Sequence, residues 1–214
     1  MSFTIDNNFP VFIGRARLAE KLAKENGYWA LDAILNSAIA LEAFPNDFIR
    51  VLRPSYELER NRLPESLIAA YRILPEVETL AIQTKYQILV HLLNGTTFDP
   101  GKPPFQDFDF LIKLRNEIVH PKCEGIDNHS AKDPYEKVTK KMLAGIHSRN
   151  LSHIGREARL PWKRHIENAQ SAEWAVATAK AMIVSICDVF PDSSLKRDWL
   201  LQITGENSSM KRPI

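Results

Sequence analysis

Apolar residues recur every three or four positions along most of this chain, and no segment of useful length alternates apolar with polar residues. A period near 3.6 residues marks the buried face of an α-helix, whereas strict alternation marks a half-buried strand. Hydrophobic residues make up 44% of the 214 residues, which is enough to fill a core. The sequence therefore predicts an all-α fold, an up-and-down helical bundle with extra short helices, and disfavours an α/β fold.

Glycine, proline and polar turn formers divide this pattern into separate helices. The expected helices span residues 15–25, 28–52, 64–95, 105–120, 135–146 and 172–190, while 147–161 show no clear pattern. Pro45 should kink or end the second helix and Pro75 should interrupt the third, because proline has no amide hydrogen to donate. No linker divides the chain, so we expect a single domain over residues 1–214 with flexible ends at 1–13 and 206–214.

The overall composition points to a soluble cytoplasmic protein. Two cysteines are too few for a disulfide framework, and no apolar run reaches the roughly 18 residues of a membrane span. The net charge of +2 does not by itself indicate a nucleic-acid binder. Residues 121–171 nevertheless carry ten Lys and Arg against six Asp and Glu. This excess fits either a nucleic-acid contact or an ordinary solvated face.

The segment most suggestive of chemistry is Arg115-Asn116-Glu117-Ile118-Val119-His120. Asn116 and His120 are four residues apart and share one helix face, and the long side chain of Arg115 can reach the same patch. A histidine can transfer protons near neutral pH, and an arginine can bind a phosphate and stabilise charge on its oxygens. These groups suit RNA cleavage without a metal ion. A helix-end ion pair and a capping histidine would explain the same residues without any catalysis.

The string LIKLRNEIVHPK, which contains Arg115, Asn116 and His120, resembles the signature of the HEPN superfamily (higher eukaryotes and prokaryotes nucleotide-binding). The stretch ALDAILNSAIALEAFPNDFI, with Glu42 after an apolar run, and the late stretch AEWAVATAKAMIVSICDVF are similar to its early and closing helices. The resemblance covers roughly residues 28–190. It implies a bundle of HEPN type and a metal-independent endoribonuclease that leaves 2′,3′-cyclic phosphate ends.

The resemblance also implies roles and partners. Arg115, Asn116 and His120 would be catalytic, and two protomers would pair into a homodimer whose motifs line one cleft. RNA would be the substrate, and such proteins commonly serve toxin, antiviral-defence or stress-response systems, in which an antitoxin or regulatory protein is a further partner. A second hypothesis is a non-catalytic helical adaptor that binds RNA, a nucleotide or a protein.

Further substrate contacts are predicted on both sides of the motif. The candidates are Lys122, Glu42, Arg149 and Arg156. The arginines could follow a phosphate backbone, and the alternatives are a solvated loop for them and a helix-pairing carboxylate for Glu42. Trp162, in a basic stretch, is a candidate for stacking on a base.

No metal or cofactor is expected. Cys123 and His129 have no second ligand pair at zinc spacing, and no glycine-rich phosphate loop occurs.

Overall fold

The computed structural model describes residues 8–59, 63–120, 134–155, 160–191 and 194–204, and these residues contain helices and no strand. The elements are α1 (Phe9–Ala23), α2 (Trp29–Glu59), α3 (Glu65–Glu76), α4 (Ile82–Asn94), α5 (Phe105–Val119), α6 (Pro134–Ser148), the 3-10 helix η2 (Trp162–His165), α7 (Ala169–Val189) and α8 (Ser194–Thr204). The prediction of an all-α fold is confirmed.

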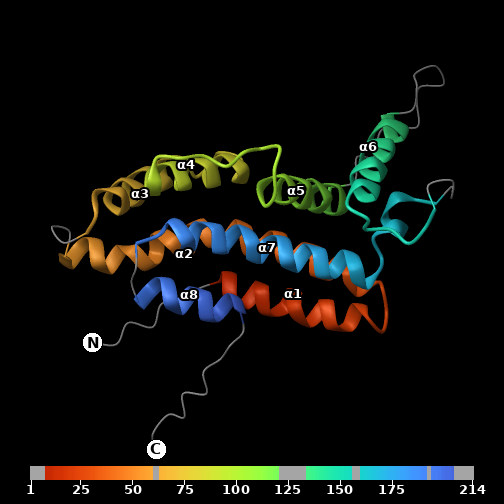
Figure 1. Cartoon of the computed structure of the whole chain (residues 1–214), viewed down its shortest axis with the longest axis horizontal. Helices are drawn as coiled ribbons and strands as arrows, with labels where there is room; N and C mark the ends of the chain where they lie inside the picture. The colour runs from red at the N-terminus through yellow and green to blue at the C-terminus, as the bar shows by residue number, and fades with distance from the viewer. Residues whose placement is uncertain (1–7, 60–62, 121–133, 156–159, 192–193, 205–214) are drawn as a thin grey trace, which may run out of the picture.

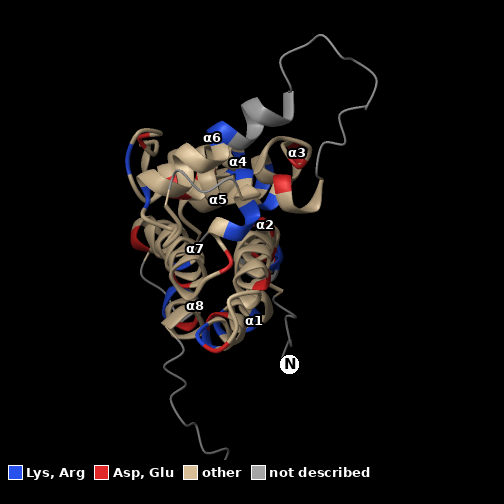
Figure 2. Ribbon diagram, turned by 90° about the vertical axis from the view of Figure 1, so that its right-hand side faces the viewer, with Lys and Arg blue, Asp and Glu red and all other residues tan. Residues whose placement is uncertain are grey.

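The two longest helices, α2 and α7, run side by side through the middle of the molecule (Figure 1). α1 and α8 lie along one side of this pair, and α3, α4 and α5 follow one another along the opposite side. Figure 2, which views the bundle along its length, shows the same two layers on either side of α2 and α7. α6 projects from one end of the bundle, and its C-terminal end lies against the first half of α5.

Aromatic side chains fill the centre of the bundle. Phe44 of α2 and Trp199 of α8 meet edge to face, with ring centroids 5.4 Å apart, and Phe48 meets Phe190 in the same way at 5.6 Å. Trp199 is 1% exposed. The helix that carries it was not expected from the sequence, because its few apolar residues give only a short pattern. Burial of this one indole explains why α8 packs onto the bundle.

Helix α2 continues through Pro45, so of the two outcomes predicted there, a kink or an end of the helix, the end is wrong. A proline inside a helix leaves the carbonyl four residues earlier without its usual donor. That carbonyl belongs to Leu41, and the hydroxyl of the buried Tyr86 on α4 donates to it at 3.1 Å. The tertiary contact replaces the missing backbone hydrogen bond, which a local reading of the sequence around Pro45 could not reveal.

The prediction of a flexible segment over residues 1–13 is wrong from residue 9 onward. α1 begins at Phe9, and the side chains of Phe9 and Ile13 are buried. Asp47 of α2 accepts the backbone N–H groups of Asn8 and Phe9, both at 2.7 Å. A carboxylate on a neighbouring helix therefore satisfies two amides at the start of α1, a role that a local capping residue usually has. The predicted flexible tail at 206–214 lies outside the described residues.

Candidate functional site

The predicted motif lies at the end of α5, whose apolar face is buried against the bundle through Phe108, Leu111 and Leu114. The helix ends at Val119, as expected from Pro121. His120 is the C-terminal cap residue, and its backbone N–H donates to the carbonyl of Asn116 at 2.8 Å. Burial of α5 fixes the backbone from which the three motif side chains project.

Arg115 connects the motif to the central helix. Its Nη2 lies 3.2 Å from Oε2 of Glu42 on α2, and its Nη1 donates to Oδ1 of Asn116 at 2.9 Å. The side chains of Arg115 and Glu42 are 25% and 34% exposed. Three of the residues singled out in the sequence are thus brought together, with the guanidinium held between a carboxylate and an amide. Among the described residues, these two contacts use two of the five N–H groups of the guanidinium.

The imidazole of His120 lies one helical turn beyond Asn116. The residue is exposed, and its ring makes no hydrogen bond or ion pair with any residue that the structure describes. A free, solvated imidazole is able to exchange protons with a bound molecule. Among the described residues, the arginine of the motif is therefore held by two partners, whereas the histidine is held by none.

A pocket of about 390 Å³ opens beside this cluster, between α2, the start of α4 and α5. Glu42 and Asn116 both line it, together with Asn46, Gln83 and Lys85. Its size is within the range of small-ligand sites. The last three residues were not predicted as site residues. Asn46 could have been predicted from the sequence because it follows Glu42 by one helical turn. Gln83 and Lys85 could not, because the position of α4 relative to α2 and α5 is known only from the structure.

Arg149, a predicted substrate contact, lies away from the motif. Its Nε donates to Oδ1 of Asp107 at 2.7 Å, and its guanidinium carbon lies 4.4 Å from the ring centroid of Phe110. Asp107 precedes Arg115 by eight residues on α5, a separation of about 12 Å along the helix. Arg149 therefore attaches the end of α6 to the start of α5 and does not join the cluster at Arg115.

The remaining predicted residues have different outcomes. Lys122 and Arg156 lie outside the described residues, as do Cys123 and His129. Trp162 is 4% exposed, so the prediction that it could stack on a base is wrong. Its ring packs into the core from η2.

A buried histidine lies next to α6 and was not among the site residues predicted from the sequence. His165 of η2 is fully buried, and its Nδ1 lies 3.0 Å from the hydroxyl of Ser152. Its Nε2 has no hydrogen-bond partner among the residues that the structure describes. The ring of His147 on α6 meets it edge to face at 5.4 Å between centroids. Burial, followed by the charges of His147 and His153, lowers the pKa of His165. The ring is therefore held neutral at the joint between α6 and η2.

Within the described residues, no helix is long and apolar enough to cross a membrane, and no group of three or more His, Cys, Asp or Glu could hold a metal ion. In comparisons with known proteins, the chain matches no family model, no curated protein and no solved structure.

Proposed function

We propose that this protein is a metal-independent endoribonuclease of HEPN type that acts in the cytoplasm as a homodimer. The observation that carries the proposal is the cluster at the end of α5, where Arg115 is held by Glu42 and Asn116 and the imidazole of His120 is exposed. Sequence resemblance supplies the reaction class, and the geometry is compatible with it.

In the proposed reaction the 2′-oxygen of a ribose attacks the adjacent phosphorus and gives up its proton to a base. The bond from phosphorus to the 5′-oxygen breaks, and that oxygen takes a proton from an acid, leaving a 2′,3′-cyclic phosphate and a 5′-hydroxyl. His120 serves as one of these two groups. Arg115 donates hydrogen bonds to the phosphate oxygens as negative charge grows on them.

Asn116 has a defined place in this scheme. Its Oδ1 already accepts a hydrogen bond from Arg115, so its amide nitrogen remains to donate to the substrate. Glu42 then acts as a positioning residue, because its carboxylate fixes one edge of the guanidinium.

A single chain supplies one His120, whereas the reaction uses both a base and an acid. Two protomers that face each other with their α5 ends would supply both imidazoles, and this is the reason for proposing a homodimer. A toxin, antiviral or stress-response role, with an antitoxin or other regulatory protein as a further partner, follows from the same resemblance.

One observation favours a second function. The ion pair between Arg115 and Glu42 satisfies much of the arginine without any ligand, as expected of a structural contact. A non-catalytic adaptor that binds RNA, a nucleotide or a protein through the pocket beside Asn116 is therefore the alternative.

The deciding experiment is incubation of the purified protein with labelled total RNA in excess EDTA, followed by end-group analysis of the fragments. The proposal expects cleavage to 2′,3′-cyclic phosphate ends by the wild type and none by an Arg115→Ala/His120→Ala variant. His91→Ala is the matched control, because His91 is an exposed histidine on a different helix, α4. Equal behaviour of the double variant and the wild type, with several RNAs tried, would favour the adaptor.

A further inference from the structure

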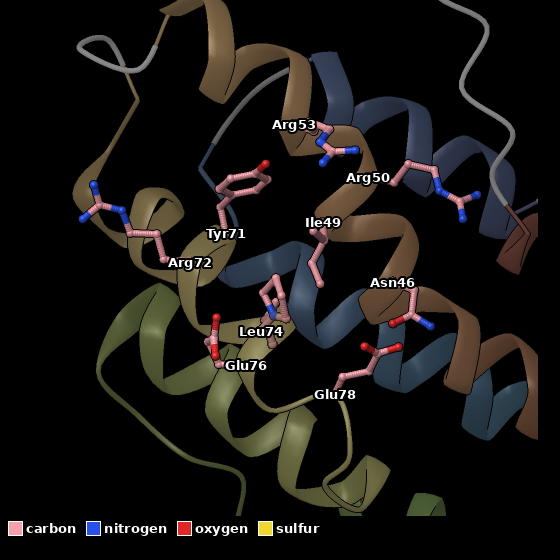
Figure 3. Close-up of a pocket in the computed structure, with 10 residues that line it drawn as sticks. Asn46, Ile49, Arg50, Arg53, Tyr71, Arg72, Leu74, Glu76 and Glu78 are labelled. Atoms are coloured by element: carbon pink, nitrogen blue, oxygen red, sulfur yellow. The ribbon is translucent and has the colours of Figure 1, made fainter.

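A second and larger pocket, of about 570 Å³, lies between α2 and α3 on the side of Asn46 remote from the motif (Figure 3). Asn46 lines both this pocket and the one beside Asn116. We refer to the larger one as the α2–α3 pocket. The shared residue makes the two hollows neighbours on one surface.

One face of α2 connects the motif to the α2–α3 pocket. Glu42, Asn46, Ile49 and Arg53 follow one another at intervals of four, three and four residues, the spacing of a single helix face. Eleven residues of helix span about 16 Å. One nucleotide occupies about 3.4 Å along a strand of a duplex, so this face can follow several nucleotides of one strand.

The α2–α3 pocket has an aromatic and apolar part. The ring of Tyr71 stacks on that of Tyr56, with centroids 4.2 Å apart and planes 28° from parallel, and Nε of Arg72 donates to the hydroxyl of Tyr56 at 3.1 Å. Figure 3 shows Tyr71 and Leu74 of α3 facing Ile49 of α2. An anchored ring beside aliphatic side chains is a suitable platform for a planar base.

The two walls of the α2–α3 pocket differ in charge. Arg50 and Arg53 project from α2, and their side chains are 51% and 68% exposed. Glu76 and Glu78 lie on the opposite wall, and Figure 3 shows Glu78 and Asn46 pointing toward one another. A ligand that carries a phosphate on one side and hydrogen-bonding N–H groups on the other would match both walls.

Both arginines on this wall have an acidic neighbour on α2. Arg53 lies 3.4 Å from Glu57, and Arg50 lies 3.9 Å from Asp47. The side chains of Arg53 and Glu57 are both exposed, and an ion pair of this kind contributes little and is readily exchanged for a phosphate.

We propose that the α2–α3 pocket binds a nucleotide of a single-stranded RNA whose chain continues from the motif. Tyr71 stacks on the base, Arg50 and Arg53 bind the phosphates, and Asn46 with Glu78 meets the polar edge of the base. The inference rests on the proposed function for the direction of the strand, since the scissile bond is placed at Arg115 and His120.

The test uses binding, so that cleavage does not enter the measurement. A fluorescent single-stranded RNA of roughly ten nucleotides, within the site sizes of known single-strand binders, is titrated against the full-length His120→Ala protein at several salt concentrations. Tyr71→Leu, Tyr71→Phe, Arg53→Ala and the control Arg197→Ala are made in that background. Arg197 is an exposed arginine on α8, away from both pockets.

Loss of stacking in Tyr71→Leu should weaken binding about tenfold, while Tyr71→Phe, which keeps the ring, should stay within about twofold. Arg53→Ala should weaken binding about threefold and reduce the slope of log affinity against log salt by about 0.7, the value for one phosphate contact on a single strand. Arg197→Ala should bind like its parent. Thermal unfolding of each variant verifies that the fold is retained.

The inference is overturned if Tyr71→Leu and Arg53→Ala bind like Arg197→Ala, or if the parent binds no single-stranded RNA, which would leave the pocket to a protein partner. Its failure is distinguishable from that of the proposed function. If the wild type cleaves RNA while the pocket variants bind normally, only the inference about nucleotide binding in the α2–α3 pocket is refuted. A wild type that does not cleave, but binds RNA through Tyr71 and Arg53, refutes only the nuclease.

Discussion

Glu42 and Arg115 are 73 residues apart in the chain, and Oε2 of the first lies 3.2 Å from Nη2 of the second. The contact joins the middle of α2 to the C-terminal half of α5. It fixes the direction of the guanidinium, whose other edge binds Asn116. The free imidazole of His120 has no comparable restraint among the described residues. Preorganisation of the motif therefore depends on the arginine.

Replacement of Glu42 separates a positioning role from a structural one. Glu42→Ala should lower the single-turnover rate of RNA cleavage about tenfold, because the guanidinium loses its anchor. Glu42→Gln can still accept the hydrogen bond and should stay within about threefold. Both side chains of the pair are partly exposed, so the free energy of unfolding, measured in urea, should change by less than about 1 kcal/mol in either variant. An equal rate for Glu42→Ala and the wild type would count against the positioning role.

Several helices could be predicted from the sequence because their apolar faces are long and regular. The span 105–120 matches α5 almost residue for residue, since a proline follows its end and a turn-rich loop precedes its start. The span 172–190 falls within three residues of α7 for the same reason of a sustained pattern. Apolar periodicity and helix-breaking residues were sufficient to predict a helix where the burial of one helix face decides the structure.

Helix boundaries could not be predicted from the sequence where a residue distant along the chain supplies a hydrogen bond that is usually local. Pro45 remains inside α2 because Tyr86 supplies a donor to Leu41, and α1 begins at Phe9 because Asp47 accepts two amides there. The same distinction holds for the site. The proximity of Arg115 to Asn116 follows from helix geometry, whereas the position of Arg149 could not be predicted because its partner Asp107 is 42 residues away in the sequence.

The contact between Tyr86 and Leu41 yields a prediction about stability. Tyr86→Phe leaves the buried Leu41 carbonyl without a donor and should lower the free energy of unfolding by about 1 to 3 kcal/mol. In a Pro45→Ala background the backbone N–H of residue 45 can bond to that carbonyl, so the same change should cost less. A double-mutant cycle by urea unfolding measures the difference. Equal costs in the two backgrounds would show that the hydroxyl does not compensate for the proline.

The buried His165 yields a prediction about pH. Its pKa in the folded state is lower than its unfolded value near 6.5, so the unfolded chain binds more protons as the pH falls below that value. The contribution of this group to stability is complete above about pH 6.5 and is lost as the pH falls toward the folded-state pKa. His165→Asn, whose amide can still meet Ser152, should show a smaller loss of stability between pH 7 and pH 5. Urea unfolding at several pH values measures the slope, and identical slopes for the two proteins would contradict the assignment.

Two glycines in helices should respond in opposite ways to alanine. A Cβ at Gly145 of α6 would lie 2.2 Å from the ring of Phe110, whereas a Cβ at Gly14 of α1 meets nothing within 4 Å. Gly145→Ala should therefore push α6 from α5 and lower the free energy of unfolding by about 1 to 3 kcal/mol. Gly14→Ala should raise it by about 0.5 to 1 kcal/mol, because alanine loses less backbone entropy in a helix. Since Arg149 also packs on the ring of Phe110, near-ultraviolet circular dichroism should change in Gly145→Ala and not in Gly14→Ala. A stabilised Gly145→Ala variant would mean that α6 does not pack against Phe110 in solution.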